Sequence, residues 1–292
     1  MRLISAKTIL GLSALLLTAA CTDELAENPA DGARPISFTP AAETRAVVEG
    51  TTLPSGSSFS VWGWYGTGNE INKNVFNNIT VTESGGTWGY TGGTQYWIPG
   101  MTYNFYGVYP ASVTASVTND GIITVEGFDC SKAVDLMTAT ATDLSGDDAP
   151  TVAMQFKHEL ARVKVSVESN GATVDGLKVY GVGYQGNFNS GNTPKWTEIV
   201  TATEEKTPLS GETAQDMLLL PATDLTNAKL KVTYHYGSDA SATRTDEASL
   251  TIAGGWAAGQ QYHYKASIVA GKLTITITVM DWNEEDTSVK WE

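Results

Sequence analysis

The chain has 292 residues, and its 32 acidic and 18 basic side chains give a formal net charge of −14. This acidity argues against a nucleic-acid partner, because binding a polyanion requires clustered Lys and Arg. Two cysteines and three histidines leave little material for a disulfide framework or a zinc site. The length allows one or two domains, and 29 glycines with only 17% charged residues argue against coiled coils and charge-rich disorder.

Residues 1–20 have the pattern of a secretory signal peptide. Arg2 and Lys7 precede an apolar stretch over residues 9–17, and small residues follow it. This stretch is too short to span a bilayer stably. Cys21 comes directly after the expected cleavage site, as in a bacterial lipobox, so we expect it to be lipidated. An ordinary cleaved signal with an incidental thiol is the alternative. Removing these residues takes away two positive charges and leaves about −16.

Residues 21–45 are predicted to form an extended prosegment, because they are polar and rich in Pro, Ala and Glu. Within it, Ile36-Ser37-Phe38 alternates like a very short strand bounded by two prolines. Arg45 precedes the small residue Ala46 in an exposed-looking loop ahead of a β-like region. This position makes it a candidate for proteolytic processing. An ordinary linker arginine is the alternative.

From residue 46 onward the sequence predicts short β-strands. Several stretches alternate apolar and polar residues with a period of two, which is typical of half-buried strands. These stretches are 59–62, 102–106, 122–125, 161–167, 230–234 and 273–279. Turn sequences such as Asn119-Asp120-Gly121 and Asn170-Gly171 separate strand candidates and favour tight hairpins. No segment keeps a helical apolar period over three turns, so we predict an all-β fold.

The β-rich region is long for a single β-sandwich, so we predict two sandwiches in tandem. The first covers residues 46–150 and the second covers residues 151–292. The acidic, loop-like stretch 143–150 marks the joint to within about ten or fifteen residues.

The sequence carries no motif of a catalytic site. It lacks a Gly-rich phosphate loop, an HExxH helix and a GxSxG elbow. Cys130 has no base placed near it, and the three histidines lie in separate strand-like segments at no metal-ligand spacing. We therefore predict a protein that is not an enzyme and uses no cofactor or metal. A glycosidase would need two carboxylates at a defined separation, and nothing in the sequence points to them.

Four of the eight tryptophans lie within residues 62–97, interleaved with tyrosines. On a solvent-facing surface they would form a platform for sugars, and a surface glycan-binding lipoprotein is therefore the alternative function. Aromatic residues at alternating positions of a sandwich usually fill its core instead. Trp62 and Trp64 share one face by parity, so a core role is the preferred interpretation.

Two segments and several shorter stretches form a recognisable series. Residues 156–165 read Phe-Lys-His-Glu-Leu-Ala-Arg-Val-Lys-Val, and residues 256–264 read Trp-Ala-Ala-Gly-Gln-Gln-Tyr-His-Tyr. The shorter stretches are 44–46, 105–110, 135–137 and 279–282. In this order and spacing the chain resembles, over nearly its whole length, the fimbrillin-like proteins. These are the Mfa-like and FimA-like type V pilins of Bacteroidales.

The resemblance implies two β-sandwich domains, the second transthyretin-like, in a structural subunit of cell-surface fimbriae that supports adhesion. It implies export to the outer membrane as a lipoprotein, with the lipid on Cys21. An Arg-specific or trypsin-like protease would then cut between Arg45 and Ala46. The strand lost would contain Ile36 and Phe38, and a strand from another fimbrial subunit would fill the vacated groove. The role as stalk, tip or anchor stays open, as does any host or bacterial surface ligand.

The C-terminal Val289-Lys290-Trp291 alternates apolar and polar residues over a short span. A donor strand needs this pattern to fill successive pockets of an incomplete sandwich. We therefore hypothesise that Val289 and Trp291 belong to the donor strand. The alternative is an edge strand of the chain's own second sandwich.

Overall fold

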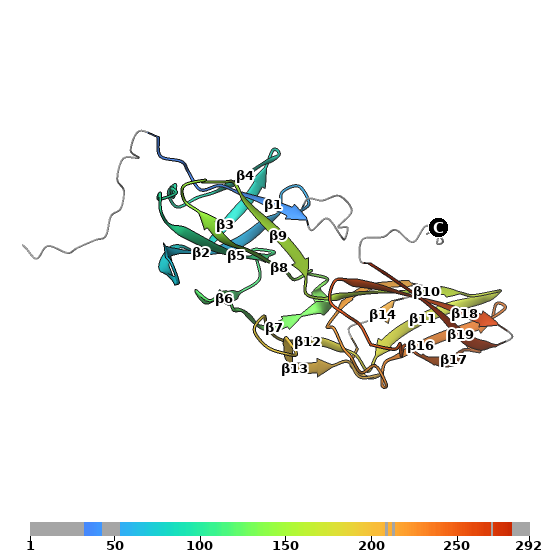
Figure 1. Ribbon diagram of the computed structural model, residues 1–292. Coiled ribbons are helices and arrows are strands. Elements are labelled where there is room, and N and C mark those ends of the chain that lie inside the picture. The colour runs from blue at the N-terminus through green and yellow to red at the C-terminus, as the bar shows by residue number, and fades with distance from the viewer. Residues whose placement is uncertain (1–31, 43–52, 208–209, 212–213, 270, 282–292) are drawn as a thin grey trace, which may run out of the picture. The chain divides into compact units, whose positions relative to one another are not determined.

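The computed structural model describes residues 32–42, 53–207, 210–211, 214–269 and 271–281, which form strands joined by turns (Figure 1). The helical element within these ranges is a three-residue 3-10 helix, η1 (Cys130–Lys132). The predicted all-β fold is therefore confirmed. In the described part of the chain, no helix is long and apolar enough to cross a membrane.

Seven strands, most of them from the N-terminal half, form one sheet. In spatial order they are β1 (Phe38–Ala42), β9 (Val152–His158), β8 (Met137–Ser145), β5 (Thr102–Tyr109), β2 (Ser58–Thr67), β3 (Glu70–Ser84) and β4 (Thr87–Tyr90). β1 pairs with β9 in parallel, whereas the other neighbours are antiparallel. The two edges approach each other, since the Tyr90 hydroxyl on β4 donates to the Ile36 carbonyl just before β1 at 3.0 Å.

Strand parity divides the side chains of this sheet between two cores. On β2, Phe59 and Val61 point to one side and Trp62 and Trp64 to the other, because successive side chains of a strand alternate. The first side is the inner core, which receives buried or partly buried side chains from all seven strands. The seven strands therefore share one inner core, and the second core lies on the other side of the sheet.

A four-stranded sheet covers the outer side of β2 and β5. Its order is β13 (Trp196–Thr201), β12 (Gly183–Asn189), β7 (Ile123–Asp129) and β6 (Ala115–Val117). Between the two sheets lies the junction core, where Trp62 and Trp64 meet Val125, Phe188 and Trp196. Because β7 pairs with β12, this sheet joins strands from the two halves of the sequence.

Two further four-stranded sheets pack against each other in the C-terminal half. One has the order β15 (Ala214–Leu219), β10 (Ala161–Glu168), β18 (Gln260–Val269) and β19 (Lys272–Asp281). The other has the order β14 (Ser210–Gly211), β11 (Ala172–Tyr180), β16 (Lys229–Tyr236) and β17 (Arg244–Ser249). On β10, buried Val163 and Val165 alternate with partly exposed Arg162 and Lys164, as the predicted strand over residues 161–167 requires. Side chains from both sheets fill a common core, so this part is a β-sandwich.

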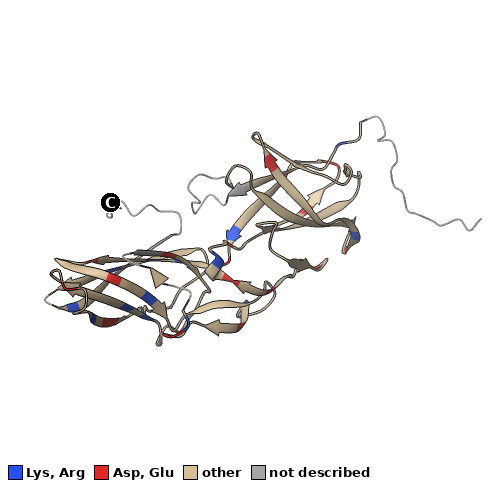
Figure 2. Ribbon diagram, turned by 180° about the vertical axis from the view of Figure 1, so that it is seen from behind, with Lys and Arg blue, Asp and Glu red and all other residues tan. Residues whose placement is uncertain are grey.

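The strands of the C-terminal half carry more ionic side chains than the seven-stranded sheet (Figure 2). Ion pairs connect neighbouring strands on the surface, such as Arg162–Asp216 at 2.7 Å and Lys265–Glu168 at 2.6 Å. Exposed pairs of this kind contribute about 0–1 kcal/mol each. The apolar core therefore supplies most of the stability of this half.

The predicted boundary between residues 150 and 151 falls just before β9. Because β9 pairs with β1 and β8, the seven-stranded sheet continues to His158. All four sheets belong to one compact unit, Arg34–Glu292. The division into two sandwich domains, and the transthyretin-like character of the second, stay predictions.

Candidate functional site

Residues 34–42, which we call the insert, fill an apolar slot in the seven-stranded sheet. Ile36 and Phe38 have 2% and 3% of their surfaces exposed. The Phe38 ring contacts three other rings edge-on, those of Phe76 and Phe105 at 5.4 Å and that of Tyr90 at 6.0 Å between centroids. These rings come from three different strands. The alternation of Ile36 and Phe38 in the sequence therefore corresponds to two side chains that enter the inner core.

The backbone of the insert is hydrogen-bonded on both sides. On one side β1 pairs in parallel with β9, and the Val152 amide donates to the Ser37 carbonyl at 2.8 Å. On the other, the Ile36 amide donates to Gln95 at 2.8 Å and the Trp97 amide donates to Arg34 at 3.0 Å. The insert therefore provides the hydrogen-bonding partners that water would otherwise provide along the edge of β9 and along the loop between β4 and β5.

Arg34 anchors the beginning of the insert. Its guanidinium donates to the carbonyl oxygens of Gly146 at 3.2 Å and Asp148 at 3.1 Å, and also to that of Asp147. The Asp147 carboxylate in turn accepts a hydrogen bond from the Gly100 amide at 3.0 Å. These hydrogen bonds therefore hold the chain just before β1 against the loop between β8 and β9. Sequence reasoning missed this residue, although a basic side chain directly before the Pro-Ile-Ser-Phe stretch was a signal for it.

Removal of the insert would expose a groove. Burying the side chains of Ile36 and Phe38 stabilises the sheet by roughly 3–6 kcal/mol in total, at about 1.5–3 kcal/mol each. Without them, the rings of Phe76, Tyr90 and Phe105 would face solvent, and the edge of β9 would lose its pairing partner. An unpaired edge beside an apolar slot is a template for another strand.

Several predicted site residues lie outside the described ranges. They are Cys21, the candidate scissile pair Arg45 and Ala46, and the candidate donor residues Val289 and Trp291. Their roles stay predictions. The structure describes the chain up to Ala42 and again from Leu53, which is buried in the inner core.

The aromatic platform considered as an alternative is wrong for the tryptophans that define it. Trp62, Trp64 and Trp97 are 3%, 9% and 5% exposed and lie in the two cores. Trp88 and Tyr90 are partly buried and pack against the inner core. Strand parity directs Trp62 and Trp64 inward, and Trp97 is buried in the loop between β4 and β5, so these three tryptophans present no aromatic face to a sugar.

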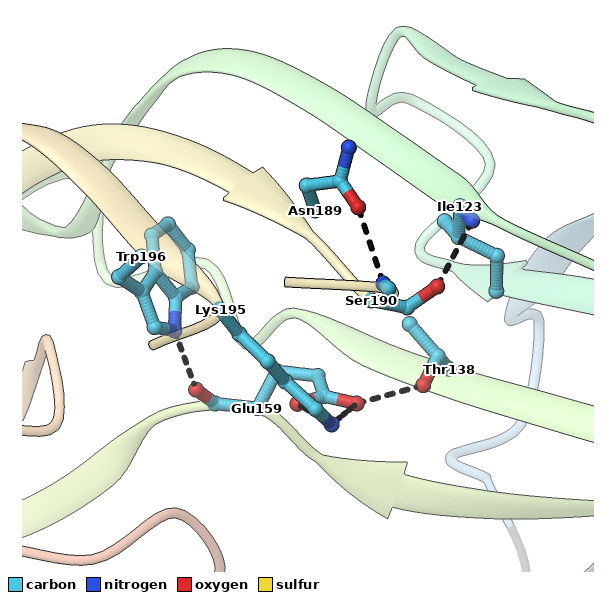
Figure 3. A network of polar contacts seen from close by, with 8 residues as sticks. Ile123, Thr138, Glu159, Asn189, Ser190, Lys195 and Trp196 are labelled. Carbon is cyan, nitrogen blue, oxygen red and sulfur yellow. Dashed lines mark hydrogen bonds and ion pairs between the residues drawn. The ribbon is translucent and has the colours of Figure 1, made fainter. Parts of the chain in front are cut away.

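A buried carboxylate lies in the turn between β9 and β10 (Figure 3). Glu159 accepts hydrogen bonds from the Thr138 hydroxyl at 2.7 Å and from the Lys195 ammonium at 3.0 and 3.2 Å. Its backbone carbonyl accepts from the Trp196 indole at 3.0 Å. This network ties the β9–β10 connection to the chain around β13. Sequence reasoning missed it, because Glu159 and Lys195 are far apart in the sequence.

The other titratable side chains singled out by the sequence have structural partners. His158 pairs with Asp135 at 2.7 Å and His235 with Asp175 at 2.8 Å. Cys130 is buried, and this burial raises the pKa of its thiol. Among the residues that the structure describes, no three His, Cys, Asp or Glu side chains gather in a way that would hold a metal ion.

Comparison with known proteins relates the chain to one group. Residues 44–282 match the family model described as fimbrillin-like. The search of curated proteins finds no match.

Solved structures of low sequence identity share the fold. A candidate cell adhesion protein from Bacteroides uniformis has a TM-score of 0.60 at 17% identity, over 87% of this chain and 100% of its own. A fimbrial protein from Bacteroides vulgatus has a TM-score of 0.58 at 16% identity, over 86% and 100% of the two chains. A candidate cell adhesion protein from Bacteroides ovatus has a TM-score of 0.55 at 20% identity, over 86% and 98%.

Proposed function

This chain belongs to the fimbrillin-like family, and on that premise we propose that it is a structural subunit of cell-surface fimbriae that polymerises by strand exchange. The observation that carries the proposal is the insert, an edge strand whose two apolar side chains complete the inner core. The family match begins at residue 44, just after β1 ends at Ala42. The segment that would be exchanged therefore precedes the matched region.

The proposed pathway begins with export as a lipoprotein, with Cys21 carrying the lipid at the outer membrane. An Arg-specific or trypsin-like protease then cuts between Arg45 and Ala46, and the insert leaves. A strand from another subunit enters the groove beside β9 and restores its hydrogen bonds and apolar contacts. The product is an extracellular fimbria that supports adhesion, and catalysis plays no part in this role.

The contacts of Arg34 support cleavage at Arg45. Arg34 lies before the family-matched region and Arg45 lies at its very beginning, but Arg34 is followed by Pro35. Proline lacks the amide hydrogen and resists cleavage at its amino side by trypsin-like proteases. A protease would also have to withdraw the Arg34 guanidinium from its three carbonyl partners. These two features favour Arg45 as the processing site.

The sequence of the insert suggests how the proposed donor strand would align in the groove. Ile36-Ser37-Phe38 places a β-branched residue, a polar residue and an aromatic residue in sequence, and Val289-Lys290-Trp291 repeats that order. We propose that Val289 takes the position of Ile36 and Trp291 that of Phe38. Trp291 would then meet the rings of Phe76, Tyr90 and Phe105.

Limited proteolysis tests this proposal. The protein starting at Thr22 is treated with a trace of trypsin and followed by non-boiled gel electrophoresis and electron microscopy. We expect a single early cut at Arg45, then SDS-resistant oligomers. Arg45→Ala should stay uncut and monomeric, while Lys73→Ala, a change at another exposed basic residue, should behave like the parent protein.

Deletion of residues 284–292 tests the donor strand independently of the groove. We expect the deleted protein to be cut normally and to stay monomeric, because it still has a groove but offers no strand. Normal polymers from this variant would overturn the donor assignment. Normal polymers from Arg45→Ala would overturn the processing step.

A further inference from the structure

A polar cavity of about 450 Å³ opens beside the β2–β3 hairpin. We call it the amide pocket, and its polar lining comprises Asn69, Asn72, Asn104, Asn119, Glu70 and Asp120. The buried ring of Tyr106 and the partly buried side chain of Ile71 complete the lining. The residues come from the hairpin, from β5 and from the turn between β6 and β7. None of the tryptophans of the sequence-based platform belongs to it.

The floor of the pocket is held in place by a hydrogen bond and by packing. The Asn104 side-chain oxygen accepts from the Asp143 amide at 2.9 Å. Tyr106 is only 4% exposed and packs in the junction core. Its hydroxyl and the Asn104 amide are therefore fixed before any ligand arrives.

Gly121 brings the wall of the pocket against this floor. Its φ of +83° favours glycine, and a Cβ atom there would lie 2.3 Å from the Tyr106 ring. The turn that carries Asn119 and Asp120 can approach Tyr106 this closely because residue 121 has no side chain. The close approach assembles the pocket from segments far apart in the sequence.

The chemistry of the lining selects a class of ligand. Each asparagine amide offers two donors and a carbonyl acceptor, the two carboxylates accept, and the tyrosine hydroxyl does both. Sugar hydroxyls also donate and accept, so several can be paired at once. Glu70 and Asp120, on a chain of net charge −14, would repel a carboxylated sugar. The volume also exceeds what a bare cation needs.

We propose that the amide pocket binds an uncharged saccharide. This proposal goes beyond subunit assembly, since it concerns a surface of the monomer away from the insert. Its test can fail without affecting strand exchange, and strand exchange can fail without affecting this test.

Ligand-observed NMR on the protein starting at Thr22 provides the test. The probes are methyl glycosides of glucose, galactose, mannose, fucose and N-acetylglucosamine, with N-acetylneuraminic acid as the charged comparison. We expect saturable binding of at least one neutral probe, weaker binding of the acidic one, and no change on adding EDTA. Binding of none of the neutral probes, a preference for the acidic sugar, or binding of Ca²⁺ alone would each overturn the proposal.

Variants locate the binding. Asn72→Ala combined with Asn119→Ala, and separately Tyr106→Phe, should weaken binding of the neutral probe by roughly tenfold, because each removes hydrogen-bonding groups. Asn77→Ala, at an exposed asparagine of β3 outside the lining, should leave affinity unchanged. Tyr106→Phe keeps the ring in the junction core, so it separates loss of a hydroxyl from loss of fold. Unchanged affinity in both pocket variants would place the sugar elsewhere and overturn the assignment.

Discussion

Glu159 and Lys195 experience different surroundings although they form one ion pair. The Glu159 side chain is 5% exposed, whereas that of Lys195 is 46% exposed. If Lys195 is lost, the buried carboxylate keeps, among the described side chains, only the Thr138 hydroxyl as a partner. If the charge of Glu159 is lost, the Lys195 ammonium can turn toward water. The two partners should therefore contribute unequally to stability.

We predict that Lys195→Met destabilises the protein by about 3 kcal/mol, because a buried charge left without its partner is strongly unfavourable. Glu159→Gln should lower the free energy of unfolding by only about 1 kcal/mol, since glutamine can still accept from Thr138. Urea denaturation of both variants measures the difference. Equal losses, or a larger loss for Glu159→Gln, would contradict this account.

The buried hydroxyl of Tyr264 makes the stability of the C-terminal sandwich depend on pH in the alkaline range. Its hydroxyl is buried, donates to the Leu250 carbonyl at 2.6 Å and accepts from the Trp256 indole at 2.8 Å. Burial raises the pKa of Tyr264 to about 12, above the value of about 10 expected in the unfolded chain. The folded state therefore holds its proton longer. The resulting stabilisation is complete below about pH 10 and is lost as the pH rises through about 12.

We expect the free energy of unfolding to fall between about pH 10 and pH 12. Tyr264→Phe should make this decline shallower, because the variant has no proton to lose at that position. Denaturation at several pH values measures the slope, with Tyr236→Phe, at a partly exposed tyrosine, as the control. An unchanged slope in Tyr264→Phe would show that this hydroxyl is not the linked group.

At the scale of elements, β1 differs from the other strands of its sheet. It is the parallel edge strand, and the side chain of Phe38, like that of Ile36 just before the strand, lies in the inner core. Its hold on the sheet combines three contributions: the Arg34 hydrogen bonds, the pairing with β9 and the rings around Phe38. Such an element can be lost only if all three are given up together.

We predict that Phe38→Ala destabilises the docking of β1 by about 3–5 kcal/mol, as for truncation of a buried aromatic side chain. Hydrogen exchange of the Val152 amide, which donates to Ser37, should accelerate accordingly. Thr39→Ala, at the next position of the strand, should change protection by less than about 1 kcal/mol. Equal protection in the two variants would show that the Phe38 ring does not hold β1.

At the scale of the whole molecule, the proposed assembly must overcome the electrostatic repulsion between negatively charged subunits. Removal of residues 1–45 takes away four basic and five acidic residues, so the processed chain has a net charge of −13. In the proposed assembly, two such subunits would repel each other before their strands meet. Salt shortens the range of this repulsion, since the Debye length falls from about 30 Å at 0.01 M to about 8 Å at 0.15 M.

Within the proposed strand-exchange pathway, we therefore predict that trypsin-processed protein polymerises roughly tenfold faster at physiological than at low ionic strength. Light scattering after a quenched digestion measures the rate. Urea denaturation of the Arg45→Ala monomer at the same salt concentrations checks that the fold itself is unaffected. A rate that falls with added salt would indicate attraction between complementary charged surfaces.

Local patterns predicted much of the fold. The alternating stretches at 161–167 and 273–279 correspond to β10 and β19, because the two-residue period of a strand depends only on neighbouring residues. The same parity correctly placed Trp62 and Trp64 in a core. At the candidate site, the alternation of Ile36 and Phe38 pointed to the insert, but Arg34 was missed because its partners follow it by more than a hundred positions.

Local alternation predicted six strands, at residues 59–62, 102–106, 122–125, 161–167, 230–234 and 273–279. It also predicted the buried side of Trp62 and Trp64 and the short apolar pattern that precedes Arg45, since each depends on the order of adjacent side chains. Three features depend on the tertiary fold: β1 lies parallel to β9, Glu159 meets Lys195, and asparagines from three segments line one pocket. Arg34 and its acceptor Asp148 are 114 positions apart. Alternation shows which side of a strand is apolar, but many strands share that pattern, so it cannot specify which of them become neighbours.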